Sequence, residues 1–173
     1  AWALSRLGRH DEAEARMSEA IGEADKIGGR IVAADWIAAA NAELALTAGR
    51  PDEAVARAAP AIEKARAIGG IYGEAVAQRI WGQALARLQP SAPEEADLHL
   101  ATSMDLFQEG GCKLEVAHTH AAWGALLHDR GDLAGAADHF GHAAELLKAA
   151  GMPKIAKAAA ANLRAARKEI NVS

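Results

Sequence analysis

The chain has 173 residues, a formal net charge of −4 and a single cysteine, Cys112. A mildly acidic chain is not expected to bind nucleic acid as its main ligand, because such binding depends on lysine and arginine neutralising the phosphates. The sequence holds no apolar run long enough to span a membrane and cannot form an internal disulfide, so we expect a protein of a reducing compartment, the cytoplasm.

The first predicted hairpin spans roughly 1–28 and begins inside a helix. We expect Asp11 to cap the second helix, which ends near Ile27 and is stopped by Gly28 and Gly29. Three apolar residues at the start should face a partner helix, and the same edge offers a surface for self-association: Trp2, Leu4 and Leu7. Because the chain opens on Ala1 rather than Met, we expect it to be a fragment of a larger protein.

The second predicted hairpin spans 29–69. Its first helix runs from about Arg30 to Ala48, and its return helix begins at Pro51. Proline suits the first position of a helix, where the missing N–H has no intrahelical partner. Pro60 lies in the middle of the return helix and is expected to bend it.

The third predicted hairpin spans 70–111, and its first helix ends near Leu88. Ser91 with Glu94 forms a capping-box pattern at the start of its second helix. The fourth hairpin spans 112–151 and turns at Gly131-Asp132, and a terminal helix follows over 153–170. We therefore expect helices throughout.

Two series of small residues recur at the same spacing. Alanines at positions 13, 54, 96 and 136 are separated by 41, 42 and 40 residues, and glycines at 28, 69, 111 and 151 are separated by the same steps. A period in this range is typical of stacked helical hairpins, in which each unit buries its apolar face against the next. Alanine lets helix axes approach closely, and glycine adopts the left-handed conformation that ends a helix.

The repeat resembles the tetratricopeptide repeat. Ala136-x3-Phe140 followed by Ala143 resembles the second helix of that repeat. Two further segments resemble its first helix: Trp123-Gly124-x2-Leu127 and Trp81-Gly82-x2-Leu85. The period of about 40 exceeds the usual 34 and also falls in the HEAT/armadillo range. The repeat is closer to the long-helix variants in the C-terminal regions of large bacterial signalling ATPases and cyclase-linked regulators than to the standard repeat. The resemblance implies an all-α, right-handed superhelix of about four hairpins plus a C-terminal helix, forming one domain over 1–173.

In tetratricopeptide stacks the first helix of each hairpin lines a concave groove, and this implies a set of partner-binding residues. The predicted groove residues are Trp36, Glu43, Thr47, Arg79, Gln83, Arg87, His118 and Asp129. Small residues share the stripe, together with Glu169 on the terminal helix: Ala39, Ala121, Ala125, Ala161 and Ala165. Arg79 and Arg87 suit a peptide carboxylate; the alternative is that they pair with Glu43 and Asp129. Trp36 is either a groove anchor or part of a helix–helix seam.

No nucleotide-binding, nucleophile or zinc-protease motif is present, so we expect no catalytic residue and no cofactor. Glu115-x2-His118 has the spacing of a di-iron site, but the sequence lacks a second such pair. The other histidines, including His120, His128, His139 and His142, are expected to form surface or interhelical hydrogen bonds rather than a metal site. The predicted function is a non-catalytic interaction scaffold that binds a peptide or helix. The alternative is a sensor domain that binds a small anionic ligand and regulates a part outside this chain.

Overall fold

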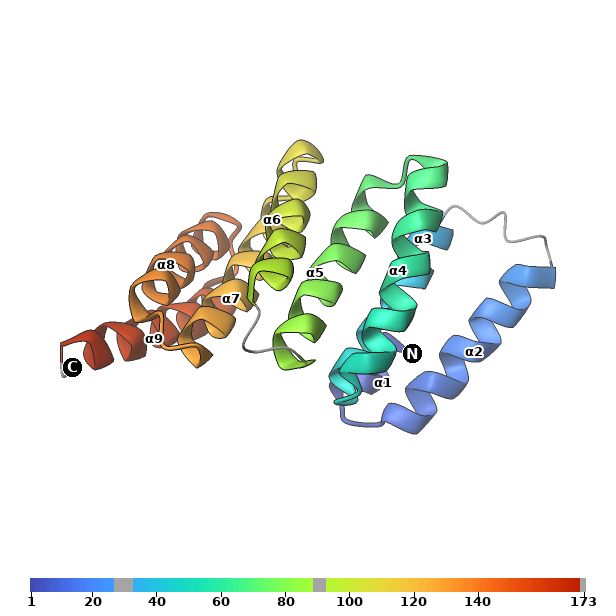
Figure 1. Ribbon diagram of the computed structural model, residues 1–173, viewed down its shortest axis with the longest axis horizontal. Coiled ribbons are helices and arrows are strands. Elements are labelled where there is room, and N and C mark those ends of the chain that lie inside the picture. Colours follow the sequence, from blue (N-terminus) through green and yellow to red (C-terminus); the bar gives the residue numbers. More distant parts are fainter. Residues whose placement is uncertain (27–32, 89–92, 172–173) are drawn as a thin grey trace. The chain divides into compact units, whose positions relative to one another are not determined.

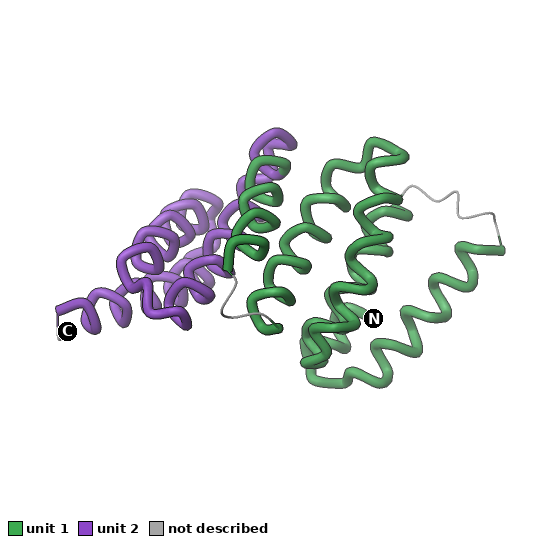
Figure 2. The backbone as a smooth tube through the Cα atoms, viewed as in Figure 1, with its two compact units in different colours: residues 1–106 green, residues 107–173 purple. Residues whose placement is uncertain are grey.

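The secondary structure is α-helical throughout the part of the chain that the computed structural model describes, residues 1–26, 33–88 and 93–171 (Figure 1). Successive helices pack as antiparallel pairs, which confirms the predicted fold class. Within these ranges no helix combines the length and apolar character needed to cross a membrane. The chain divides into two compact units, Ala1–Leu106 and Phe107–Ser173, which are described separately below (Figure 2).

The first unit is built on three closely packed helices. α3 packs against both α4 and α5, and α4 packs against α5, while α1 and α2 join this group through fewer contacts (Figure 1). The helices are α1 (Trp2–Arg6), α2 (His10–Lys26), α3 (Ala34–Thr47), α4 (Pro51–Ile68), α5 (Ile71–Leu88) and α6 (Pro93–Glu109), the last turn of which belongs to the second unit.

The second unit places one helix between two others. α8 (Leu133–Ala149) packs against α7 (Lys113–Asp129) and against α9 (Pro153–Ile170). Asp132 caps α8, because its carboxylate accepts a hydrogen bond from the Gly135 N–H at 2.9 Å. The predicted turn at Gly131-Asp132 and the predicted terminal helix are confirmed.

Both repeat series have the expected structural role. The four alanines of the series are at most 1% exposed: Ala13, Ala54, Ala96 and Ala136. Three glycines of the second series have positive φ and end their helices: Gly69, Gly111 and Gly151. The fourth, Gly28, lies outside the described residues.

Some predicted boundaries are wrong. Asp11 lies inside the first turn of α2 rather than at its cap, because the helix already begins at His10. α3 begins at Ala34, later than the predicted Arg30. Leu7 is 72% exposed and faces no partner helix among the described residues, whereas Leu4 packs against a core cluster that includes Met17 and Leu44.

Several other predictions lie beyond what the structure describes. The predicted helix end at Ile27, the stop at Gly28-Gly29 and the Ser91 capping box fall outside the described residues. α4 does continue through Pro60, and the bend expected there remains a prediction.

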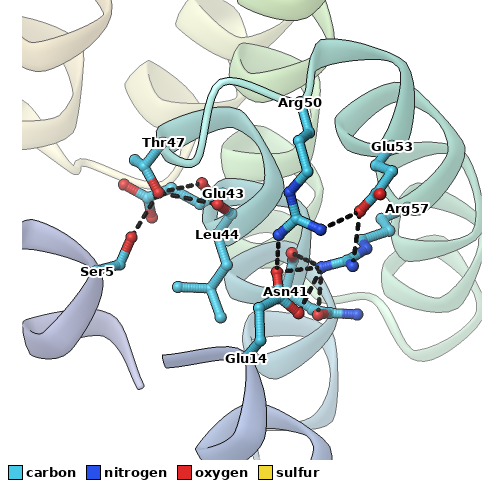
Figure 3. A network of polar contacts seen from close by, with 9 residues as sticks. All are labelled: Ser5, Glu14, Asn41, Glu43, Leu44, Thr47, Arg50, Glu53 and Arg57. Atoms are coloured by element: carbon cyan, nitrogen blue, oxygen red, sulfur yellow. Dashed lines mark hydrogen bonds and ion pairs between the residues drawn. The ribbon is translucent and has the colours of Figure 1, made fainter. Parts of the chain in front are cut away.

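A polar network holds α2 against the hairpin of α3 and α4 (Figure 3). The Glu14 carboxylate on α2 accepts hydrogen bonds from Arg50 at 2.5 Å and from Arg57 at 3.0 and 3.2 Å. Arg57 also donates to the backbone and side-chain oxygens of Asn41, both at 3.1 Å, and to Glu53 at 3.0 Å. Burial alone would raise the pKa of Glu14, but the hydrogen bonds and positive charges of Arg57 and Arg50 outweigh it and lower that pKa. The network is therefore strongest while Glu14 is ionised.

Candidate functional site

Two of the predicted groove residues of α3, Glu43 and Thr47, contact the N-terminal helix α1. The Glu43 carboxylate accepts a hydrogen bond from Trp2 Nε1 at 2.8 Å and lies 3.9 Å from Arg6 Nη2. Thr47 Oγ1 lies 2.5 Å from Ser5 Oγ (Figure 3). Trp36 is 46% exposed, so its ring is not enclosed in a helix–helix seam.

The groove residues of α5 differ in their surroundings. Arg87 is exposed, and its Nη1 donates to the Leu46 carbonyl near the end of α3 at 3.0 Å. Arg79 and Gln83 are half-buried. This hydrogen bond from Arg87 joins α5 to α3. The Glu43 carboxylate, the alternative partner expected for the two arginines, interacts with Trp2 and Arg6 instead.

In the second unit, four of the seven predicted stripe residues of α7 and α9 line one cavity, and Ala121, Ala161 and His118 do not. This α7–α9 pocket has a volume of about 240 Å³. Its lining residues are Ala125, His128 and Asp129 from α7, Phe140 from α8, and Asn162, Ala165 and Glu169 from α9. Four of them belong to the stripe predicted from the repeat register: Ala125, Asp129, Ala165 and Glu169. His118, one helical turn earlier in the stripe, is not in the lining; its Nδ1 lies 3.6 Å from Glu115.

The α7–α9 pocket combines an apolar base with an acidic mouth. Phe140 is 3% exposed, and the two alanines leave space above it. His128 Nε2 lies 3.2 Å from a Glu169 oxygen, and the Asp129 side chain is 80% exposed. Two carboxylates at the mouth of a partly apolar cavity suit a positively charged side chain with an aliphatic stem, such as that of lysine or arginine.

A second set of side chains, most of them polar, occupies corresponding positions of the repeat register in the hairpins α3/α4, α5/α6 and α7/α8. We call these positions the hairpin seam. Its residues are Ala38, Asn41, Arg57 and Pro60 in α3/α4; Gln78, Trp81, His99 and Thr102 in α5/α6; and His120, Trp123, His139 and His142 in α7/α8. The same pair of positions is in contact in all three hairpins: Arg57 with Asn41, His99 with Trp81, and His139 with Trp123.

The seam is occupied differently in each hairpin. In α5/α6 the His99 ring stacks on Trp81 with ring centroids 4.5 Å apart, and His99 Nδ1 lies 2.5 Å from Gln78 Oε1. In α3/α4 the smaller Ala38 and Asn41 border a cavity of about 270 Å³. Ile21, Ala24 and Asp25 of α2 line the same cavity. This cavity was not predicted from the sequence, although asparagine at a seam position that holds tryptophan in the other two hairpins is the signal for it.

In the α7/α8 hairpin three histidines meet at the seam. His120 Nδ1 lies 3.1 Å from His139 Nδ1, and the His120 ring centroid is 5.0 Å from those of both His139 and His142. Of the histidines singled out from the sequence, His139 and His142 come together here, whereas His128 binds Glu169 and His118 lies by Glu115. His120 of α7 completes the cluster.

Burial, followed by the neighbouring His139 and His142, lowers the pKa of His120 from 6.5 to about 4. We expect acid to destabilise the second unit through this residue. The unfolded chain binds the proton below about pH 6.5 and the folded chain only near pH 4, so stability is full above pH 6.5 and is lost as the pH falls toward 4. Allowing for partial exposure, the loss between pH 7 and pH 5 should be about 1 kcal/mol.

His120→Gln is the matched variant for this prediction, because glutamine occupies the equivalent seam position at Gln78. Urea denaturation at pH 7 and pH 5 should show a smaller pH dependence in the variant than in the wild type. An unchanged pH dependence would assign the acid sensitivity to other groups.

No protein-family model and no curated protein matches this sequence. Among solved structures, the crystal structure of BtubC (BKLC) from P. vanneervenii is similar over 97% of this chain and 77% of its own, with a TM-score of 0.60 and 18% sequence identity. At this identity the likeness establishes the fold. The chain therefore has the fold of a TPR-like stack of helical hairpins.

Proposed function

We propose that this chain is a non-catalytic protein-interaction module that binds a segment of a partner protein along the first helices of its hairpins. The α7–α9 pocket is the observation that carries the proposal. Residues spaced by four on α7 and on α9 line one cavity, as the groove interpretation of the repeat requires: Ala125, Asp129, Ala165 and Glu169. The alanines leave room for a partner side chain, and the carboxylates provide charge.

The chemistry of the pocket favours a partner segment that presents lysine or arginine. The apolar base formed by Phe140, Ala125 and Ala165 accommodates the aliphatic stem of such a side chain. The carboxylates of Asp129 and Glu169 would then face the charged end group of that lysine or arginine side chain. Exposed ion pairs contribute about 0.2–1 kcal/mol each, so the carboxylates select the partner and its register more than they supply the affinity.

Selection from a random peptide library tests this proposal. Peptides that bind the chain should be enriched in lysine or arginine at one anchor position. Their affinity, measured by fluorescence anisotropy, should fall at least tenfold in the Asp129→Lys/Glu169→Lys variant, because like charges placed together at an interface cost several kcal/mol. Affinity should also weaken as the salt concentration rises.

A matched control changes the same charge outside the pocket. Asp138→Lys/Glu145→Lys alters two exposed carboxylates of α8 and should leave the affinity near that of wild type. If both double variants weaken binding equally, net charge rather than the pocket is responsible. If binding survives the pocket variant and is lost in Arg79→Glu/Arg87→Glu, the α5 stripe carries the function and the partner is acidic. If the selection yields no binders, the interaction proposal fails.

We also propose that the repeat is the long-helix tetratricopeptide variant and that the chain regulates a larger, bacterial signalling protein in the cytoplasm. The period of about 40 residues and the helices of 14 to 18 residues in the hairpins from α3 to α8 support the first part. The edge formed by Trp2, Leu4 and Leu7 remains a proposed surface for self-association. Trp2 is 44% exposed and Leu7 72% exposed; light scattering at several concentrations tests this.

A further inference from the structure

The three histidines at the seam of α7 and α8 are not used by the proposed binding pocket. His120 belongs to α7, and His139 and His142 lie three residues apart on one face of α8. Their rings are brought together by the same helix packing that joins Trp81 to His99 in the preceding hairpin. A cluster of three imidazoles from two rigid helices is a possible set of metal ligands.

The distances within the cluster match those between ligands of a single ion. Bonds of about 2.0–2.1 Å to a tetrahedral ion place two ligand nitrogens about 3.3 Å apart and the centres of their rings about 5 Å apart. Here the facing Nδ1 atoms of His120 and His139 are 3.1 Å apart. The ring centroids of His120 and His139, and those of His120 and His142, are each 5.0 Å apart.

The other hairpins show how the same seam is filled without such a cluster. In α5/α6 the amide of Gln78 meets His99, and position 102 is threonine. In α3/α4 the corresponding residues are Ala38, Arg57 and Pro60. Of these three hairpins, α7/α8 alone has imidazole at all three positions.

The chemistry of imidazole determines which ions suit the cluster. Neutral imidazole is the form that binds metals, and it favours zinc, nickel and copper over magnesium and calcium.

We propose that His120, His139 and His142 bind one divalent transition-metal ion of the class that prefers imidazole. Among the described residues no three His, Cys, Asp or Glu side chains already form a group that could hold a metal ion, so binding requires a ring to turn. His142 is exposed, so its ring is the one that we expect to turn toward the facing nitrogens of His120 and His139.

Calorimetric titration of the 173-residue chain, free of any histidine tag, with Zn²⁺ alone tests the proposal. The wild type should bind one ion. His120→Gln, which places glutamine where Gln78 stands in the preceding hairpin, and His142→Ala should each weaken binding roughly tenfold or more. His10→Gln, a histidine exchange in the first unit, should bind like the wild type.

Tryptophan fluorescence with Cu²⁺ locates the ion independently. The Trp123 ring centroid is 4.7 Å from that of His139, so an ion held by the cluster should quench this tryptophan. Trp123→Phe should lose most of the quenching while calorimetry still detects one ion.

The proposal is overturned if the wild type binds no Zn²⁺ at 100-fold excess, or if His142→Ala and His120→Gln retain wild-type affinity. In the second case the ion is adventitious and bound by other surface residues. Should circular dichroism show that His120→Gln does not fold, the exposed His142→Ala variant decides the question.

Discussion

Replacing Gly82 by alanine should lower the free energy of unfolding by about 2 kcal/mol. A Cβ atom at this position in α5 would lie 2.7 Å from the Ala96 carbonyl oxygen and 2.9 Å from Leu100 Cγ, both on α6. The closest atom belongs to the backbone, so the two helices must separate. Such overpacking costs about 3 kcal/mol. Because alanine has a higher helix propensity than glycine, it offsets about 1 kcal/mol of this cost. Urea denaturation followed by circular dichroism measures the difference.

Gly141→Ala is the matched control for this prediction. Gly141 lies inside α8, and a Cβ atom there would meet nothing within 4 Å. The same exchange should therefore stabilise the protein by about 0.5–1 kcal/mol. If Gly82→Ala and Gly141→Ala have the same free energy of unfolding, α5 and α6 do not cross as closely as described. Gly124, at the equivalent position in α7, should resemble Gly82, because its Cβ atom would meet the Phe140 ring at 2.9 Å.

Phe140→Ala should destabilise the second unit by about 3–5 kcal/mol, the usual cost of removing a buried phenylalanine side chain. Phe140 is 3% exposed and packs in a cluster with Ala136, Ala137 and Ala166, against which Leu127 and Leu163 also pack. The cluster joins α7, α8 and α9, so the cavity left by the ring would open toward all three helices. Hydrogen exchange of amides in α7 to α9 measures the loss locally.

Phe140→Leu separates this effect from partner binding. Leucine keeps most of the buried volume, so its cost should be well below that of alanine. Because Phe140 also lines the α7–α9 pocket, peptide affinity in the leucine variant reports on the base of the pocket in a folded protein. A loss of less than 1 kcal/mol in Phe140→Ala would show that this core is not as closely packed as described.

The repeat was predictable because its signals are local. Alanine at a helix crossing and glycine with positive φ depend on spacing along one helix and on the geometry of one turn, and both series met their expected roles at Ala54, Ala96, Gly69 and Gly111. Proline likewise marked the starts of α4 and α9. The errors at Asp11 and at the start of α3 concern helix ends, where several residues are comparable caps.

Part of the candidate site followed from the same register. Counting by four along α7 and α9 placed Ala125, Asp129, Ala165 and Glu169 on one stripe, and the structure places all four around one pocket. Phe140, His128 and Asn162 were missed as lining residues. They enter the pocket from other faces, which a single stripe does not describe.

The sequence was sufficient to predict the all-helical class, the period of the hairpins and the alanines that are buried, because these depend on the 3.6-residue turn and on local backbone conformation. The polar side chains that meet across helices are known only from the folded chain: Glu14 with Arg57, Gln78 with His99, and His120 with His139. Those pairings depend on the rotation of each helix about its axis. That rotation is determined by the summed packing of many side chains, so spacing along one helix cannot supply it.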